Sequence, residues 1–438
     1  MLRRKPRIFI GFIEIAGYFN NLSRGFKSLG IDCAFYDLHG HRFNYRTDRV
    51  SFLVRLHQYC ANKLFEKKHP TILWKLISLN IKILLFFWAL IKYDVFIFGF
   101  GSSFYRYKEL PILKIFGKTI IHVFLGTDAR PSFISGNVVI QQVMKQEGGF
   151  DFDLLYEDTV QRKKRIARIE KYADYIVNHP PTAHFQSRKF ISFMRMGFPF
   201  DIQTDLATAD PSSPGSNGIV RIVHAPSFAE AKGTKVIRQY IKNLRNKGYK
   251  IDFIEIINRP HSEVLTVLSQ CDFVIDELYS DIPLGGLGTE AAFYSKPTVN
   301  GGYYSGMIKD NYPPEAIPPA LYCMPQEMEG AIERLIVDEV FRNKLGKEAK
   351  QFVETRWSVQ DVAKRYLQMI EGNAPDDWFF NPYDIHYIHG YGLSEEKLRL
   401  ILRGFIEKYG PEALQISDKP DLLKKFVQFS QTLNQCVK

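Results

Sequence analysis

The sequence is poor in cysteine: five cysteines lie scattered over 438 residues, without a Cys-x-x-Cys pair. This pattern excludes a disulfide scaffold and a structural zinc site. A secretory signal is also lacking, because the first apolar run is short and ends at Glu14. We therefore expect no export and a location in the reducing cytoplasm.

Long apolar runs are rare as well. The longest, over residues 71–91, is interrupted by Lys75, Asn80 and Lys82. Since a lysine near the centre of a spanning helix is costly in lipid, we expect no transmembrane segment. Two interpretations stay open: a buried helix of a large α/β domain, or a helix whose apolar face rests in a membrane interface.

Acidic residues are scarce at the start of the chain. Residues 1–92 hold 16 Lys and Arg against 5 Asp and Glu, whereas the remaining residues are collectively neutral. Such an excess favours an anionic partner, and we expect a membrane surface. Nucleic acid is not expected, because aromatic RNA-reading motifs and zinc spacing are missing. The basic run 162–165 (RKKR) is interpreted as a solvated helix face.

Strand-like and helix-like runs alternate along the chain. The strands read as continuous apolar runs, which is typical of parallel sheets covered on both faces. The sequence therefore predicts an α/β fold with two doubly wound Rossmann-like domains. The expected divisions are a first domain at 1–206, a Pro-, Gly- and Ser-rich linker at 207–218, a second domain at 219–374 and a helical tail at 375–438.

A first candidate binding point follows the opening strand of the second domain. His224 ends that strand, and Lys232-Gly233-Thr234 begins the next helix. Backbone N–H groups, the helix dipole and the Lys232 ammonium would then meet at a point that suits a diphosphate. The alternative is a capped helix start with a solvated lysine.

A second candidate point is the glycine-rich segment 285–288 (GGLG), which precedes another helix. Glycines let a main chain approach phosphates closely, and Glu290 in the first helical turn can accept hydrogen bonds from a ribose diol. Alternatively, Glu290 only complements the helix dipole. The predicted donor-binding residues are Ser227, Lys232, Gly233, Thr234, Asp281, Gly286, Gly288, Thr289 and Glu290.

The order and spacing of these pieces resemble the nucleotide-binding half of GT-B glycosyltransferases, particularly the retaining family 4 type. The resemblance covers residues 219–300 and rests on Lys232-Gly233, Cys271-Asp272, Gly286 to Gly288, Glu290-Ala291 and Lys296-Pro297. Segment 124–130 (FLGTDAR) is similar to transferases that build capsule and lipopolysaccharide sugars.

The resemblance implies an enzyme that moves a sugar from a nucleotide sugar to a growing surface polysaccharide or lipid-linked glycan, peripherally at the inner face of the cell membrane. It also implies that the tail crosses back onto the first domain. Lys232 and N–H groups near Gly286 and Gly288 would stabilise the leaving phosphate. We expect neither a metal nor a cofactor, since no Asp-x-Asp pair stands in a suitable loop.

The acceptor side is expected in the first domain, at Glu14, Gly17, His122 and Arg130, near predicted strand ends. The predicted catalytic residues are Lys232, Glu290 and Asp128. Asp128 is the one expected on the acceptor side. Asp128 would act as the base if the reaction inverts the configuration of the sugar, and Glu14 or His122 could take that role instead. An Asp that caps a helix and a core histidine are the structural alternatives for Asp128 and His122.

Two other functions remain open on sequence grounds. A GT-B-fold sugar-nucleotide epimerase would use the same donor site without an acceptor. A non-catalytic protein that binds nucleic acid or membrane would explain the basic residues 1–92 and would bind nucleic acid with strong salt dependence.

Overall fold

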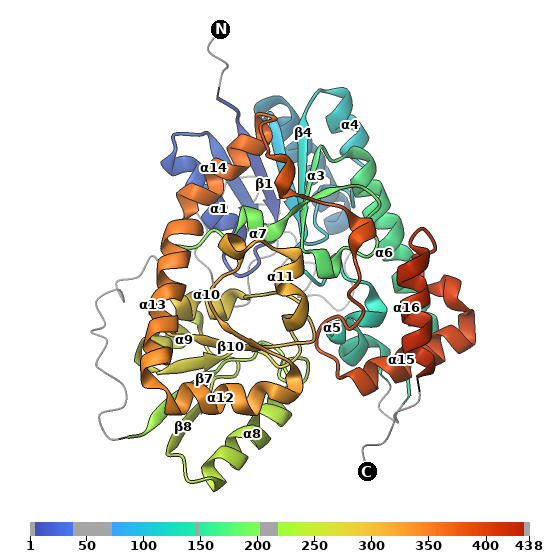
Figure 1. Ribbon diagram of the computed structural model, residues 1–438. Coiled ribbons are helices and arrows are strands. Elements are labelled where there is room, and N and C mark those ends of the chain that lie inside the picture. The colour runs from blue at the N-terminus through green and yellow to red at the C-terminus, as the bar shows by residue number, and fades with distance from the viewer. Residues whose placement is uncertain (1–4, 38–71, 145–148, 202–217, 433–438) are drawn as a thin grey trace.

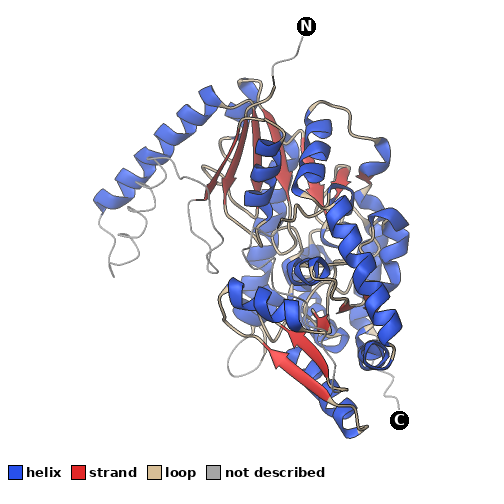
Figure 2. Cartoon of the chain, turned by 90° about the vertical axis from the view of Figure 1, so that its left-hand side faces the viewer, coloured by secondary structure: helices blue, strands red, loops and turns tan. Residues whose placement is uncertain are grey.

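The computed structural model describes residues 5–37, 72–144, 149–201 and 218–432. Its strands form two separate groups with helices around each (Figures 1 and 2). Residues 207–217 of the expected linker, residue 71 of the expected apolar helix and part of the basic region 1–92 lie outside the described residues.

The first sheet has seven strands in the order β12-β6-β5-β4-β3-β1-β2. Its pairs are parallel, except that β12 from the C-terminal part of the chain runs antiparallel to β6. The strands are β1 (Ile8–Phe12), β2 (Cys33–Asp37), β3 (Val95–Gly99), β4 (Thr119–Val123), β5 (Tyr175–Asn178), β6 (Phe190–Ser192) and β12 (Phe379–Phe380). The helices between them are α1 (Tyr18–Ser28), α3 (Ile72–Lys92), α4 (Leu110–Ile115), α5 (Gly136–Val138), α6 (Phe152–Tyr172) and α7 (Phe193–Met196).

The second sheet has five parallel strands in the order β11-β10-β9-β7-β8. They are β7 (Val220–His224), β8 (Ile251–Glu255), β9 (Phe273–Ile275), β10 (Thr298–Gly301) and β11 (Leu321–Cys323). The helices that follow are α8 (Thr234–Asn246), α9 (His261–Gln270), α10 (Gly286–Phe293), α11 (Ile308–Asn311), α12 (Met328–Val337) and α13 (Glu339–Arg356).

Both sheets have the doubly wound strand order, so the predicted fold class is confirmed. In each sheet the order reverses beside the first strand, between β1 and β3 and between β7 and β9. Ligands of such sheets bind outside the carboxyl ends of the strands at this reversal. The loops after β1, β3, β7 and β9 are therefore the places to search for a site.

The chain returns to the first domain at α14 (Val359–Ile370), inside the range 219–374 that we had assigned to the second domain. α13 runs beside the lower sheet, and α14 lies over α1 (Figure 1). The contact is tight, since a Cβ on Gly25 would meet the Val359 carbonyl oxygen at 2.1 Å. The last helices, α15 (Glu395–Tyr409) and α16 (Pro420–Gln431), share a core with the first sheet.

The helix α3 combines the two interpretations of residues 71–91. From residue 80 on, where its side chains are described, Ile81, Leu85 and Ala89 are buried. On another face Leu84, Phe87 and Ile91 are 60%, 54% and 79% exposed. Among the described residues no helix is long and apolar enough to cross a bilayer. One side of α3 thus packs on the domain, and the other leaves apolar surface uncovered.

Candidate active site at the facing edges of the two sheets

Lys232 occupies the turn between β7 and α8. Gly233 next to it has φ 73°, a left-handed conformation that favours glycine. His224 Nε2 lies 2.9 Å from Thr234 Oγ1, which ties the strand end to the helix start. The Lys232 Nζ donates to Asp276 Oδ1 at 2.7 Å and to Glu277 Oε1 at 3.4 Å. Lys232 is thus an ion-pair centre, not a solvated lysine.

Asp276 and Glu277 directly follow β9 and are buried. Burial alone would lower the pKa of Lys232, but these two carboxylates outweigh it and raise that pKa. Burial raises the pKa of Glu277 to about 7, although Lys232 acts against the shift. Asp276 Oδ2 and Glu277 Oε2 have no hydrogen-bond partner in the described part of the chain.

Sequence reasoning missed these two acidic residues. The signal was available, because two adjacent carboxylates directly after a continuous apolar strand stand at the edge where ligands bind in doubly wound sheets.

The glycine-rich segment lies against the same carboxylates. A Cβ on Gly285 would be 3.1 Å from Asp276 Oδ2 and 3.7 Å from Glu277 Oε1. Thr289 Oγ1 donates to the Gly285 carbonyl at 2.8 Å, and a Cβ on Gly288 would meet Leu284 at 2.4 Å. The starts of α8 and α10 therefore meet around Asp276.

Glu290 has a partner that the sequence did not indicate. Its Oε1 lies 2.7 Å from Nε2 of His261, the first residue of α9. Burial alone would lower the pKa of His261, but the Glu290 carboxylate outweighs it and raises that pKa. Lys232 thus lies just before α8, whereas Glu290 is the fifth residue of α10 and not in its first turn, so that prediction was wrong. Each of the two has its own partner. Ser227 is exposed.

The first domain closes onto this edge through Arg130. Its Nε and Nη2 donate to the two oxygens of Asp281, at 2.5 and 2.6 Å. Arg130 is 3% exposed and Asp281 is fully buried. Nearby, a Cβ on Gly286 would lie 3.4 Å from the Cβ of Ala16 in the loop after β1. Arg130, expected on the acceptor side, and Asp281, expected at the donor, form one pair between the two sheets.

A segment of the C-terminal part of the chain passes between the two domains at this point. Tyr391 pairs with the first domain, where its N–H donates to the Ile134 carbonyl and its carbonyl accepts from the Gly136 N–H. Gly392 donates to the Tyr279 carbonyl of the second domain. The Arg130 guanidinium lies 4.9 Å from the centre of the Tyr391 ring. Sequence reasoning had not placed this residue near the site.

Asp128 and His122 lie deeper in the first domain. Asp128 Oδ1 accepts from the Leu125 N–H at 3.0 Å, and burial raises its pKa. Its carboxylate therefore binds its own loop and does not cap a helix. His122 packs between the rings of Tyr107 and Phe124, and burial lowers its pKa to about 3. A histidine so hard to protonate is a core residue, as the structural alternative held.

Glu14 and Gly17 build the start of α1. Glu14 accepts the backbone N–H groups of Ile15, Phe19 and Asn20. Burial raises its pKa to about 8, although these hydrogen bonds act against the shift. Gly17 precedes the helix with φ 80°. Glu14 is therefore occupied as a helix cap, and this occupation weakens its case as a base.

The basic run 162–165 is not a uniformly solvated face, so that interpretation was wrong in part. Arg162 is buried, where it binds the Thr127 carbonyl and pairs with Asp158 at 2.9 Å. Arg165 Nη2 donates to the Asp128 carbonyl at 2.8 Å. Arg162 and Arg165 hold the loop after β4 against α6, because they satisfy carbonyl groups that the strand leaves unpaired.

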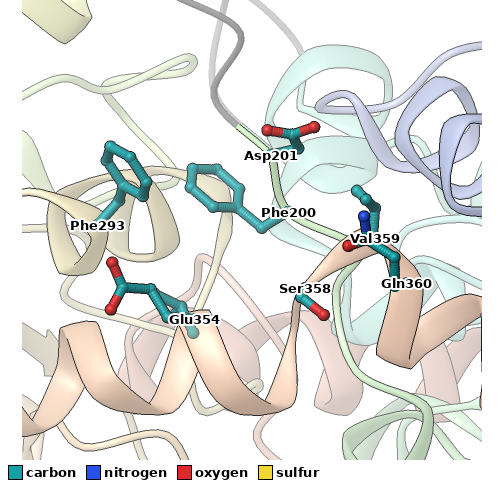
Figure 3. Close-up of a pocket in the computed structure, with 8 residues that line it drawn as sticks. Phe200, Asp201, Phe293, Glu354, Ser358, Val359 and Gln360 are labelled. Atoms are coloured by element: carbon teal, nitrogen blue, oxygen red, sulfur yellow. The ribbon is translucent and has the colours of Figure 1, made fainter. Parts of the chain in front are cut away.

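A cavity of about 230 Å³ lies at the crossing between the domains (Figure 3). Phe200 and Phe293 line it, with their rings 5.9 Å apart, beside Ser358 at the start of α14. Its charged lining residues are Asp201 and Glu354. Because no cation lines it beside these two carboxylates, this cavity does not suit a diphosphate.

The described ranges contain no group of three or more His, Cys, Asp or Glu side chains that could hold a metal ion.

Among solved structures, the chain is similar to sucrose-phosphate synthase from Thermosynechococcus elongatus, at 14% identity and a TM-score of 0.46 over 84% of this chain and 99% of that one. HepE from Anabaena, solved with UDP-glucose, is similar at 12% identity and a TM-score of 0.45, over 83% of this chain and 99% of that one. MnaA from S. aureus, solved with UDP, is similar at 11% identity and a TM-score of 0.43, over 85% of this chain and 98% of that one. No family model and no curated protein sequence matches. At such low similarity, function must be argued from the residues of the chain itself.

Proposed function

We propose that this protein is a glycosyltransferase that moves a sugar from a nucleotide-sugar donor to a lipid-linked or polysaccharide acceptor. One observation carries the proposal. Lys232 and the glycine-rich start of α10 converge on Asp276 where the carboxyl edges of two doubly wound sheets face each other. Such an edge is the usual ligand position in these folds, and helix starts with glycine suit phosphates.

In this proposal the donor diphosphate binds between Lys232 and the start of α10. The bond between the anomeric carbon and the diphosphate oxygen breaks, and the bond to the acceptor oxygen forms. Negative charge develops on the leaving diphosphate, where the ammonium and the positive helix end can neutralise it. Asp276 holds Lys232 in place at 2.7 Å and so preorganises the cation.

The hydroxyl groups of the donor find acceptors at the same edge. Glu290, oriented by His261, accepts hydrogen bonds from the ribose diol. Asp276 Oδ2 and Glu277 Oε2 are buried and without partners among the residues described, so hydroxyl groups of the transferred sugar can satisfy them. Because Arg130 and Asp281 close the edge, the two domains must separate for the donor to enter.

On the acceptor side, Asp128 takes the proton of the acceptor hydroxyl in an inverting reaction. Burial raises the pKa of Asp128, and its Oδ2 has no hydrogen-bond partner among the described residues. The transfer proceeds without a metal ion. Its place is the cytoplasmic face of the cell membrane, where the exposed apolar side of α3 rests on lipid.

Thermal shifts with UDP-, GDP-, ADP- and CMP-sugars test the donor site. We expect one nucleotide class to raise Tm by several degrees at saturation, because a ligand of the folded state stabilises it. Lys232→Met should abolish this shift and lower donor turnover by roughly 100-fold or more, as loss of a preorganised charge does elsewhere. The control is Lys235→Met, which removes an exposed lysine from the first turn of α8.

Removal of Lys232 alone leaves two buried carboxylates, which can impair folding. The variant Lys232→Met/Glu277→Gln removes one positive and one negative charge together and keeps the net charge of the trio. A folded double variant that still responds to nucleotide sugars would contradict the donor site. Equal donor consumption with and without an acceptor glycolipid would favour an epimerase over a transferase.

A further inference from the structure

A second cavity, of about 450 Å³, lies in the first domain between the segment after β3 and the middle of α6. One of its walls, residues 101–108, follows the carboxyl end of β3, an edge at which ligands of such sheets bind. The donor site described above uses none of its lining. The cavity is lined by Gly101, Arg106, Tyr107, Lys108, Gln161, Lys164, Arg165 and Arg168.

The lining is basic throughout. Five of its eight side chains are cationic and none is acidic. Within the described ranges none of the five forms an ion pair. By contrast, Arg130 pairs with Asp281, and Arg162 of α6 pairs with Asp158. A sixth cation, Lys82 of α3, is near enough to Arg106 for that guanidinium to lower its pKa, together with burial. Five cations that form no ion pair among the described residues point to an anionic ligand.

Two polar atoms in the cavity wall lack partners. Tyr107 is 1% exposed, and neither its hydroxyl nor the Arg165 Nε has a hydrogen-bond partner among the described residues. Buried donors are normally satisfied, and here one donor on each side of the cavity lacks an acceptor. Arg165 is held by its Nη2, which donates to the Asp128 carbonyl, and its Nε is therefore preorganised.

The helix α3 packs against the segment that lines the cavity. Phe86 of α3 packs on Phe104 and Tyr105, with ring centres 5.2 and 6.0 Å apart, and these residues begin the loop that carries Arg106 and Tyr107 into the cavity. Leu84 and Phe87 are exposed on the same helix. A ligand with an anionic head and an apolar chain can contact both surfaces at once.

We propose that this cavity binds the phosphate groups of a lipid phosphate, whose apolar chain lies along the exposed side of α3. In the proposed transferase this lipid phosphate is part of the acceptor, so its role in the reaction rests on the proposed function. The position suits that role, because Asp128 lies behind Tyr107 and Arg165 and influences the pKa of Tyr107. Binding itself does not depend on transfer.

Isothermal titration with farnesyl diphosphate, inorganic pyrophosphate and farnesol tests the inference. We expect farnesyl diphosphate to bind more tightly than either of the other two. Lys164→Glu/Arg168→Glu changes two exposed lining residues and should weaken binding about tenfold or more, because charge-assisted contacts become repulsive. Tyr107→Phe, which removes only the unpartnered hydroxyl, should weaken it less. Lys171→Glu, exposed on the same helix but outside the lining, is the matched control.

The outcomes separate the possible ligands. Undiminished binding in Lys164→Glu/Arg168→Glu would overturn the site. Equal affinity for pyrophosphate and farnesyl diphosphate would overturn the lipid part, and tighter binding of a single-stranded oligonucleotide would overturn it in favour of nucleic acid. Nucleotide-sugar thermal shifts should be unchanged in all cavity variants. If those shifts are absent in the wild type while farnesyl diphosphate binds, the proposed function fails and the cavity inference stands.

Discussion

At the scale of single residues, the candidate donor site is already charge-paired without a substrate. Lys232 lies between Asp276 and Glu277, and Arg130 is paired with Asp281. Such buried charges need a counter-ion, since an unpaired ion is costly in a low-dielectric interior. Burial raises the pKa of Glu277, so its protonation should be visible in the stability of the protein.

Glu277→Gln should change the pH dependence of unfolding. Burial raises the pKa of Glu277 from 4.5 to about 7, so between these pH values the folded state binds more protons than the unfolded chain. Stability contributed by this group is therefore present at low pH and lost as pH rises towards about 7. Tm measured from pH 5 to 8 should fall less steeply in Glu277→Gln than in the wild type.

The control is Glu263→Gln, which changes an exposed glutamate on α9 and should keep the wild-type slope. If Glu277→Gln also keeps that slope, the carboxyl is not protonated in the folded state and Lys232 neutralises it fully.

At the scale of elements, the helix start at α8 shows how backbone shape positions the site. Gly233 has φ 73°, and a Cβ there would meet the Leu278 side chain at 2.6 Å. The turn thus needs glycine for two reasons, conformation and space. The close packing of Gly233 on Leu278 brings Lys232 towards the end of β9, because Leu278 follows Asp276 and Glu277 directly in the chain.

Gly233→Ala should destabilise the protein more than Gly248→Ala. Both glycines have positive φ, but nothing lies within 4 Å of a Cβ on Gly248. Gly248→Ala should therefore cost only the conformational strain, about 1 kcal/mol, and Gly233→Ala should add the clash with Leu278. Urea unfolding measures both costs. Equal costs would mean that Leu278 moves away freely and does not hold the turn.

Elements with a clear period were predicted closely from the sequence. The apolar period predicts helices over 234–246 and 395–409, and α8 and α15 have these bounds, because each has one apolar face. The return of the chain at α14 was not predicted. Its apolar face is compatible with either domain, and only its contact with α1, where Gly25 lets the backbones approach, assigns it to the first.

At the scale of the whole molecule, the buried ion pair Arg130–Asp281 links the two domains at the site. A more exposed group of ion pairs, centred on Arg195, links distant parts of the chain at the surface. Arg195 pairs with Glu315 at 2.8 Å and with Asp377 at 2.7 Å. The carboxylates of this second group are 48% and 59% exposed. The two contacts therefore differ in burial, while both link distant parts of the chain.

Arg130→Met should destabilise the protein by roughly 3–5 kcal/mol, because Asp281 then stays buried without a counter-ion. Arg130→Met/Asp281→Asn should recover part of this loss. Arg195→Met, the control, should cost only about 0–1 kcal/mol, as exposed ion pairs contribute little. A double-mutant cycle by urea unfolding gives the coupling energy. If Arg130→Met costs no more than Arg195→Met, the two domains are not held together by this pair in solution.

The sequence by itself determines the two doubly wound sheets, the start of α8 after Lys232 and the glycine-rich segment that begins α10, because periodicity and turn residues act over short distances along the chain. Only the tertiary structure decides which side chains meet. Arg130 and Asp281 are 151 residues apart, and the basic cavity joins Arg106 and Lys108 to residues of α6. Such pairings depend on how the domains pack, which local patterns do not encode.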